Sequence, residues 1–132
     1  MSAAEFRPLF DERLNHLFKL RTQLMRALKR AGDVMTIQHV ADRVLDGRFQ
    51  MWSAPESAII TEVVQFPLRK TLHYFLVVGD LEECLALQPE IEAFAKANGC
   101  FVVTCAGREG WDRILPRFGW KKQWSVLAKE LV

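Results

Sequence analysis

Two strand-like runs with a helix between them constrain the fold of this 132-residue chain more than any other feature. Residues 70–78 and 100–105 are rich in β-branched and aromatic side chains, which favour strands. Between them, residues 81–98 repeat apolar side chains at helical spacing, and Pro89 is expected to kink or break this helix. Since a helical connection is typical of parallel neighbours, we expect the two strands to pair in parallel through a right-handed crossover.

The preceding half of the chain divides into a helical part and a strand-rich part, with no linker, repeat or low-complexity segment between them. Apolar residues recur at helical spacing from about residue 12 to Gly32, and again from Thr36 to Gly47. From Arg48 onwards the spacing is that of strands separated by proline turns. We therefore expect two helices packed on a meander of three antiparallel strands. These strands are predicted at residues 49–54, 58–66 and 70–78.

Both ends of the chain are expected to add a strand to this sheet. Residues 4–8 predict a short first strand, because a proline is tolerated at a strand end. Near the other end, apolar side chains recur at helical spacing from Trp111 to Phe118, and Gly119 follows where a helix end favours positive φ. Residues 120–131 then predict a last strand.

The order of these elements, β-α-α-β-β-β-α-β-α-β, resembles that of the GNAT (GCN5-related N-acetyltransferase) fold over nearly the whole chain. The Gly-Arg-x-Gly-Trp turn at residues 107–111 is also similar to that of small GNAT-like proteins encoded by tailed bacteriophages. The resemblance implies an α/β (α+β) fold in a single domain over residues 1–132. Its sheet would be mixed and mostly antiparallel, with one parallel strand pair, and flanked by helices. GNAT proteins usually end in two strands, whereas this chain offers one.

The resemblance also implies where acetyl-CoA would bind, namely between the strands at residues 70–78 and 100–105. The cofactor would then contact five residues: Phe75, Val77, Val78, Gly79 and Arg108. The phosphate loop of the family reads Arg/Gln-x-x-Gly-x-Gly/Ala, and here only Gly79 of that pattern remains. Asp80, Glu82 and Glu83 stand beside it, and each would repel a diphosphate by roughly 1 kcal/mol at short range. We therefore expect no bound cofactor.

Two further features of the family concern catalysis. The helix that follows residues 100–105 lacks the tyrosine that protonates the departing thiolate, and the one tyrosine, Tyr74, lies in a strand. Glu62 is the best candidate for a general base, because it shares a strand face with apolar residues. A carboxylate at the rim of the sheet is the simpler interpretation of Glu62. Cys105 would be a nucleophile only if a base activated it, and a buried core cysteine is the favoured interpretation.

The charge of the chain is unevenly distributed. Six Lys or Arg and no acid occur from Arg13 to Arg30, whereas residues 80–92 carry five acids and no base. Arg21, Arg26 and Arg30 are therefore candidates for binding an acidic surface, either on another protein or on a second copy of the chain. The alternative is that these arginines form a basic helix face that is simply solvated and binds no partner. Nucleic acid is not expected as a partner, because the net charge is only +2 and the bases are not interleaved with aromatic residues.

Composition restricts where the chain would work. Since no run of eighteen apolar residues occurs and the N-terminus has acids where a signal peptide is apolar, no membrane partner is expected. The three cysteines are odd in number, which favours reduced thiols, and the three histidines are too far apart in sequence to predict a metal site. We expect the cytoplasm of a bacterial host cell, or the virion, as the location.

Two interpretations of function follow. In the favoured one, the chain is a catalytically degenerate GNAT-fold protein that acts as a binding or assembly component of a bacteriophage particle, with phage structural proteins as partners. In the alternative, it is an acetyl-CoA-dependent N-acetyltransferase that acts on an amine. The degenerate phosphate loop favours the first interpretation, and the overall order of elements fits both.

Overall fold

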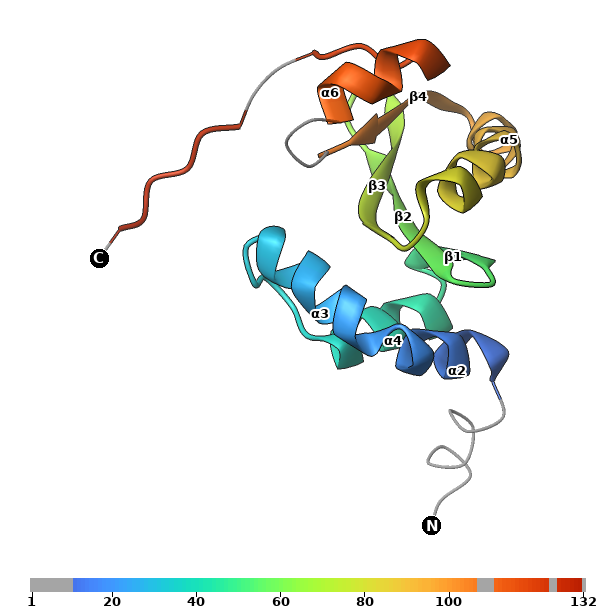
Figure 1. Cartoon of the computed structure of the whole chain (residues 1–132). Coiled ribbons are helices and arrows are strands. Elements are labelled where there is room, and N and C mark those ends of the chain that lie inside the picture. The colour runs from blue at the N-terminus through green and yellow to red at the C-terminus, as the bar shows by residue number, and fades with distance from the viewer. Residues whose placement is uncertain (1–10, 107–110, 124–125, 132) are drawn as a thin grey trace.

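The computed structural model of the chain describes residues 11–106, 111–123 and 126–131. Within them, a four-stranded sheet lies between a group of helices on one face and a long helix on the other (Figure 1). In chain order the elements are α2 Glu12–Lys19, α3 Arg21–Arg30, α4 Ile37–Leu45, β1 Phe49–Ala54, β2 Ser57–Gln65, β3 Lys70–Val78, α5 Leu81–Ala97, β4 Cys100–Cys105, α6 Trp111–Ile114 and the 3-10 helix η1 Leu115–Phe118.

The sheet has the order β1-β2-β3-β4. The pairs β1–β2 and β2–β3 are antiparallel, and β3–β4 is parallel, with α5 as the crossover between them. The expected mixed, mostly antiparallel sheet with one parallel strand pair is therefore confirmed. The connection is parallel because a helix carries the chain back across the sheet before β4 begins.

The apolar residues of the strands alternate between two cores. One core lies between the sheet and α2, α3 and α4, and the other lies between the opposite face and α5. The first contains Leu17, Leu20, Leu24, Ala27, Leu28, Val40, Val44, Phe49, Ala58, Ile60, Leu76 and Val78. The second contains Ile59, Leu72, Tyr74, Cys84, Ile91 and Ala95.

The first long helix of the sequence analysis is two helices. A single helix was expected up to Gly32, but α2 ends at Lys19 and α3 begins at Arg21. Leu20 lies between them with φ −95° and ψ 14°, and its side chain is only 1% exposed. The Arg21 guanidinium donates to the Phe18 carbonyl oxygen at 2.9 Å, so a carbonyl at the break has a side-chain partner.

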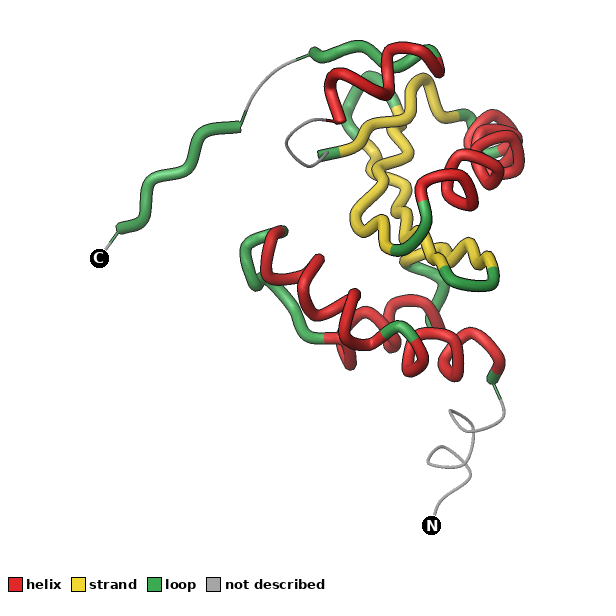
Figure 2. Tube along the Cα trace, in the orientation of Figure 1, coloured by secondary structure: helices red, strands yellow, loops and turns green. Residues whose placement is uncertain are grey.

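Pro89 does not end α5, which continues through it as a helix of 17 residues. The ribbon of α5 changes direction near its middle (Figures 1 and 2), as expected where a proline removes one backbone donor and crowds the preceding turn. Cys84, Ile91 and Ala95 are buried on the two sides of Pro89. Packing of both halves against the sheet therefore holds the helix together.

The expected strand at residues 120–131 is wrong for the part that the structure describes, since residues 120–123 and 126–131 form no strand. The expected strand at residues 4–8 lies outside the described residues. Gly119 does close η1 with φ 90°, as the sequence predicts. Among the helices that the structure describes, none is long and apolar enough to cross a membrane.

Candidate functional site

The strand β3 continues beyond the end of β4. Their pairing runs from Lys70 opposite Cys100 to Tyr74 opposite Cys105, so the last four residues of β3 have no β4 neighbour. Phe75 is the extra residue of a β-bulge, because Ile60 of β2 pairs with Leu76 and the next residue of β2 pairs with Tyr74. The sequence predicted a cofactor beside this unpaired end of β3.

The predicted cofactor residues on β3 lie mostly in the cores. Phe75 packs against the α2–α4 core, and its ring centroid is 5.5 Å from that of Phe49. Val77 packs against the α5 core on the opposite face, and Val78 is buried at 1% exposure. Their side chains therefore serve packing on two different faces. Arg108 lies outside the described residues.

The start of α5 is hydrogen-bonded to the β1–β2 turn. The Asp80 N–H donates to Ser57 Oγ at 2.8 Å, and the Ser57 hydroxyl donates to the Glu83 carboxylate at 2.7 Å. The same carboxylate accepts the Glu56 N–H at 3.0 Å. Asp80 is the N-cap of α5, and its side chain accepts the Glu83 N–H at 3.1 Å. Two N–H groups at the helix start are therefore already bonded within the chain.

Gly79 makes this contact possible. Its φ is +105°, and a Cβ atom there would overlap the Glu56 carbonyl oxygen and the backbone of Ser57. A glycine is required for both reasons, because other residues rarely adopt this φ and none would leave room for the turn. The glycine that matches the family's phosphate loop is thus explained by packing.

These residues do not fit a diphosphate. A phosphate at a helix N-terminus is bound by free N–H groups and by the positive end of the helix dipole. Here Asp80 and Glu82 are exposed carboxylates in the first turn, and Glu83 adds a third. The acids complement the helix dipole themselves, and they would repel a second anion.

Glu62 lies in a row of polar side chains that crosses the sheet. It is opposite His73 on β3, and His73 is opposite Thr104 on β4. His73 Nδ1 is 2.9 Å from Thr104 Oγ1. Burial lowers the pKa of His73, and the charge of Glu62 acts in the opposite direction. His73 was missed in the sequence because only the strand register brings it beside Glu62.

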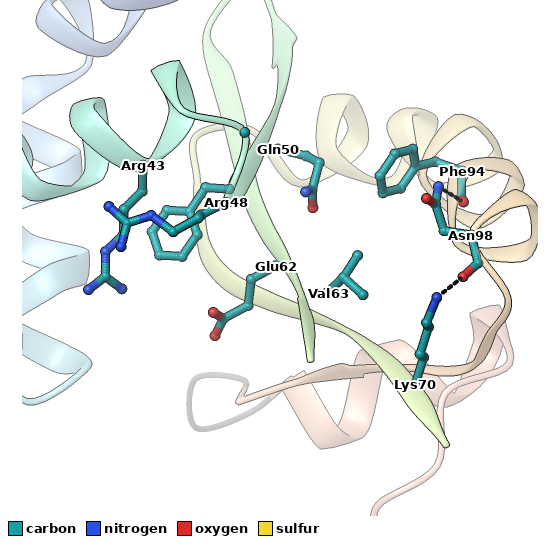
Figure 3. A pocket seen from close by; sticks show the side chains of 10 residues that line it. Arg43, Arg48, Gln50, Glu62, Val63, Lys70, Phe94 and Asn98 are labelled. Carbon is teal, nitrogen blue, oxygen red and sulfur yellow. Dashed lines mark hydrogen bonds between the residues drawn. The ribbon is translucent and has the colours of Figure 1, made fainter. Parts of the chain in front are cut away.

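Glu62 also lines an open hollow of about 520 Å³. Arg43 and Arg48 lie on one side of Glu62, and Lys70 and Asn98 lie on the other (Figure 3). Two of these bases have other partners: Arg48 pairs with Asp46 at 2.7 Å, and Lys70 Nζ donates to the Asn98 carbonyl oxygen at 3.2 Å. The ion pairs found among the described residues do not include Glu62. Its half-buried carboxylate is therefore open to the hollow.

A small apolar pocket lies on the other face of the sheet, beside α5. Tyr74 is 4% exposed, and its hydroxyl has no hydrogen-bond partner among the described residues. Trp120 packs edge-on against Tyr74, with ring centroids 5.3 Å apart. Burial raises the pKa of Cys105 to about 11, so this thiol is protonated at neutral pH and is a poor nucleophile.

The three candidate arginines are exposed on α3. Arg26 and Arg30 are one helical turn apart, whereas Arg21 lies 4.2 Å over the ring of Phe18. Phe18 and Met25 are 66% and 61% exposed, so apolar surface accompanies the bases.

Sequence comparison gives no relative: no protein-family model matches the chain, and no curated protein sequence matches it. Several solved structures share its fold. A tetramutant of the BH1408 protein from Bacillus halodurans has a TM-score of 0.67 at 15% identity, over 91% of this chain and 95% of that one. A Trypanosoma brucei acetyltransferase has a TM-score of 0.58 at 15% identity, over 83% and 94%. A protein described as a probable acetyltransferase has a TM-score of 0.63 at 11% identity, over 90% and 93%.

These likenesses concern the fold alone, because the identities are between 11% and 15%. Together with the sheet topology, they show that the chain has a GNAT-like fold.

Proposed function

We propose that this chain is a GNAT-fold protein that has lost acetyl transfer and acts by binding another protein. The start of α5 carries the proposal. There the β1–β2 turn and the Asp80 cap occupy N–H groups that a diphosphate would need, and Glu82 and Glu83 add negative charge. Protonated Cys105 supplies no nucleophile in place of a cofactor.

Titration with acetyl-CoA by calorimetry tests the loss of the cofactor site. We expect a dissociation constant weaker than about 0.1 mM, which corresponds to about 5.5 kcal/mol of binding free energy. Replacing Asp80 by Asn and Glu82 by Gln removes two negative charges and keeps a side chain that can cap α5. This double variant should bind acetyl-CoA tighter than the wild type by about five-fold or more.

A matched pair of substitutions controls for overall charge. Glu90→Gln and Glu92→Gln remove two exposed acids from the same helix but away from its start, and they should leave the affinity unchanged. Saturable binding of acetyl-CoA by the wild type at low micromolar concentration would overturn the proposal.

N-acetylation of an amine is the second candidate function. The half-buried Glu62 beside His73 favours it, and two of the neighbouring structures are described as acetyltransferases. If this function were correct, the wild type would consume acetyl-CoA with an amine, and Glu62→Gln would abolish the consumption while leaving the fold intact.

For the protein partner, we propose contact with the outer face of α2 and α3. Phe18 and Met25 expose apolar surface there, and α3 carries Arg21, Arg26 and Arg30 without any acid. Long basic side chains over apolar surface fit an acidic protein patch, because charge attraction brings the surfaces together and apolar burial stabilises the contact. Assembly of a bacteriophage particle, in the host cytoplasm or the virion, is the setting we propose. That setting rests on the resemblance of residues 107–111 alone.

Charge reversal tests this surface. Glutamate at Arg21, Arg26 and Arg30 should abolish capture of a partner from a lysate of the infected host. The same reversal at Arg117, Lys121 and Lys122, which are exposed elsewhere, should preserve capture. The captured protein must then be purified and shown to bind the wild type with an affinity that falls with salt. Equal capture by the two triple variants would place the interface elsewhere, and a partner that is no phage structural protein would overturn the phage setting.

A further inference from the structure

The hollow beside Glu62 lies where β1 no longer covers β2. Phe49 is the first residue of β1 and is opposite Glu62, so residues 63–65 of β2 have no β1 partner. Successive residues of a strand point to opposite faces, and Val63 packs on the α5 side, so Glu62 points to the α4 side. The hollow therefore reaches around this edge of β2, between α4 and α5 (Figure 3).

Two bases and one acid bring charge to the hollow that no ion pair among the described residues neutralises. Glu62 is the acid. Arg43 is half-buried, with its guanidinium carbon 5.5 Å from the centre of the Phe49 ring, and no hydrogen bond or ion pair joins it to another described residue. Lys70 Nζ donates to the Asn98 carbonyl oxygen, which is uncharged, so the positive charge of Lys70 also remains.

This arrangement selects against simple ions. An anion drawn to the bases meets the Glu62 carboxylate, and a cation drawn to Glu62 meets Arg43 and Lys70. Arg48 changes the balance little, because Asp46 pairs with it at 2.7 Å. A molecule with an ammonium group between two carboxylates matches both signs of charge. Glu62 and Arg43 are half-buried, so their attraction for such groups is stronger than it would be in bulk water.

We propose that the hollow binds an acidic α-amino acid, with its ammonium group on Glu62 and its two carboxylates on Arg43 and Lys70. A guanidinium offers two parallel N–H donors to a carboxylate, and Lys70 keeps two N–H groups beyond the one bonded to Asn98. Phe94 also lines the hollow and offers apolar surface to the methylene groups of the ligand. The volume of about 520 Å³ is within the usual range for a small-molecule site.

The site stands apart from the proposed protein contact and from the start of α5. Asn98 is the C-cap of α5, about 25 Å along the helix from the Asp80 cap. The outer face of α3 contributes no residue to the hollow. Glu62 is shared with acetyl transfer, the second candidate function, and binding is therefore measured without acetyl-CoA.

Titration with L-glutamate, followed by two-dimensional NMR of the backbone amides, tests the proposal. The wild type should bind with a dissociation constant of about 1 mM or tighter, and the shifted amides should be those around the hollow. Glutarate keeps both carboxylates and lacks the ammonium group, whereas 4-aminobutyrate keeps the amine and one carboxylate. Each should bind about ten-fold more weakly than L-glutamate, because each leaves one charge of the hollow unmatched.

Two substitutions separate the two signs of charge. Glu62→Gln should weaken L-glutamate binding by about ten-fold and leave glutarate binding unchanged or tighter, since the repelling carboxylate is gone. Arg43→Gln should weaken the binding of both ligands by about ten-fold. Glu130→Gln and Lys122→Gln are the matched controls, because both residues are exposed and neither lines the hollow, and both variants should bind as the wild type does.

Three results would overturn the proposal. One is a wild type that shows no saturation with L-glutamate up to about 10 mM. Another is glutarate binding as tight as that of L-glutamate, which would make the hollow a site for anions alone. The third is L-glutamate binding that a folded Glu62→Gln variant retains in full. If circular dichroism shows that this variant is unfolded, shifted amides away from the hollow in the wild type would overturn the proposal instead.

Discussion

Alanine at position 79 is expected to lower the free energy of unfolding by about 2–5 kcal/mol, which is a large share of the stability of a small domain. Gly79 has φ +105°, where alanine is strained, and the new Cβ would overlap the Glu56 carbonyl oxygen and the backbone of Ser57. The turn must then move away from α5 and lose its hydrogen bonds to Asp80 and Glu83. Denaturant unfolding followed by circular dichroism measures the loss.

Gly47→Ala is the matched control. Gly47 has a similar φ of +86°, but a Cβ there would meet nothing within 4 Å. Its substitution should cost only the backbone strain, about 1–2 kcal/mol. The difference between the two variants reports the packing of the β1–β2 turn on Gly79. Equal losses would mean that the turn does not pack there.

Leu20→Ala is expected to lower the free energy of unfolding by about 2–5 kcal/mol, the usual range for removing a buried leucine side chain. Leu20 is 1% exposed and belongs to the core between α2–α4 and the sheet, although its backbone lies at the break between two helices. Thermal and denaturant unfolding should agree on the size of the loss.

Phe18→Ala tests the same segment from the outside. Phe18 is 66% exposed, so its removal should change the free energy of unfolding by about 0.5 kcal/mol or less. A small loss for Leu20→Ala, comparable with that of Phe18→Ala, would contradict the buried position of Leu20.

The sequence was sufficient to predict the elements whose periodicity is local. The strands of the meander and α5 were found because each buries apolar residues at a regular spacing, and β4 was found from its β-branched and aromatic composition. The parallel pair followed from the helix between its strands. Leu20 also fits this local pattern, because it lies three residues after Leu17 and four before Leu24, on the same side as both, and reaches the core.

Features that depend on distant segments were not predictable. The pairing of Glu62 with His73 depends on strand register, and the contact of Gly79 with Ser57 joins residues more than twenty positions apart in the chain. The predicted last strand failed for a related reason. The apolar residues from Val126 to Leu131 favour an extended strand, but a strand also needs a neighbour, and its position depends on the fold of distant segments.

The bonds between the β1–β2 turn and α5 also bear on how the molecule opens. Ser57 both receives the Asp80 N–H and donates to Glu83, so the tip of the hairpin cannot fray without releasing the first turn of the helix. Helix ends and hairpin tips are ordinarily the first parts of a fold to open locally. Here the tip of the β1–β2 hairpin and the first turn of α5 open together, in one cooperative event. The chain thereby extends the protection of its interior to a corner that would otherwise exchange with solvent at two separate points.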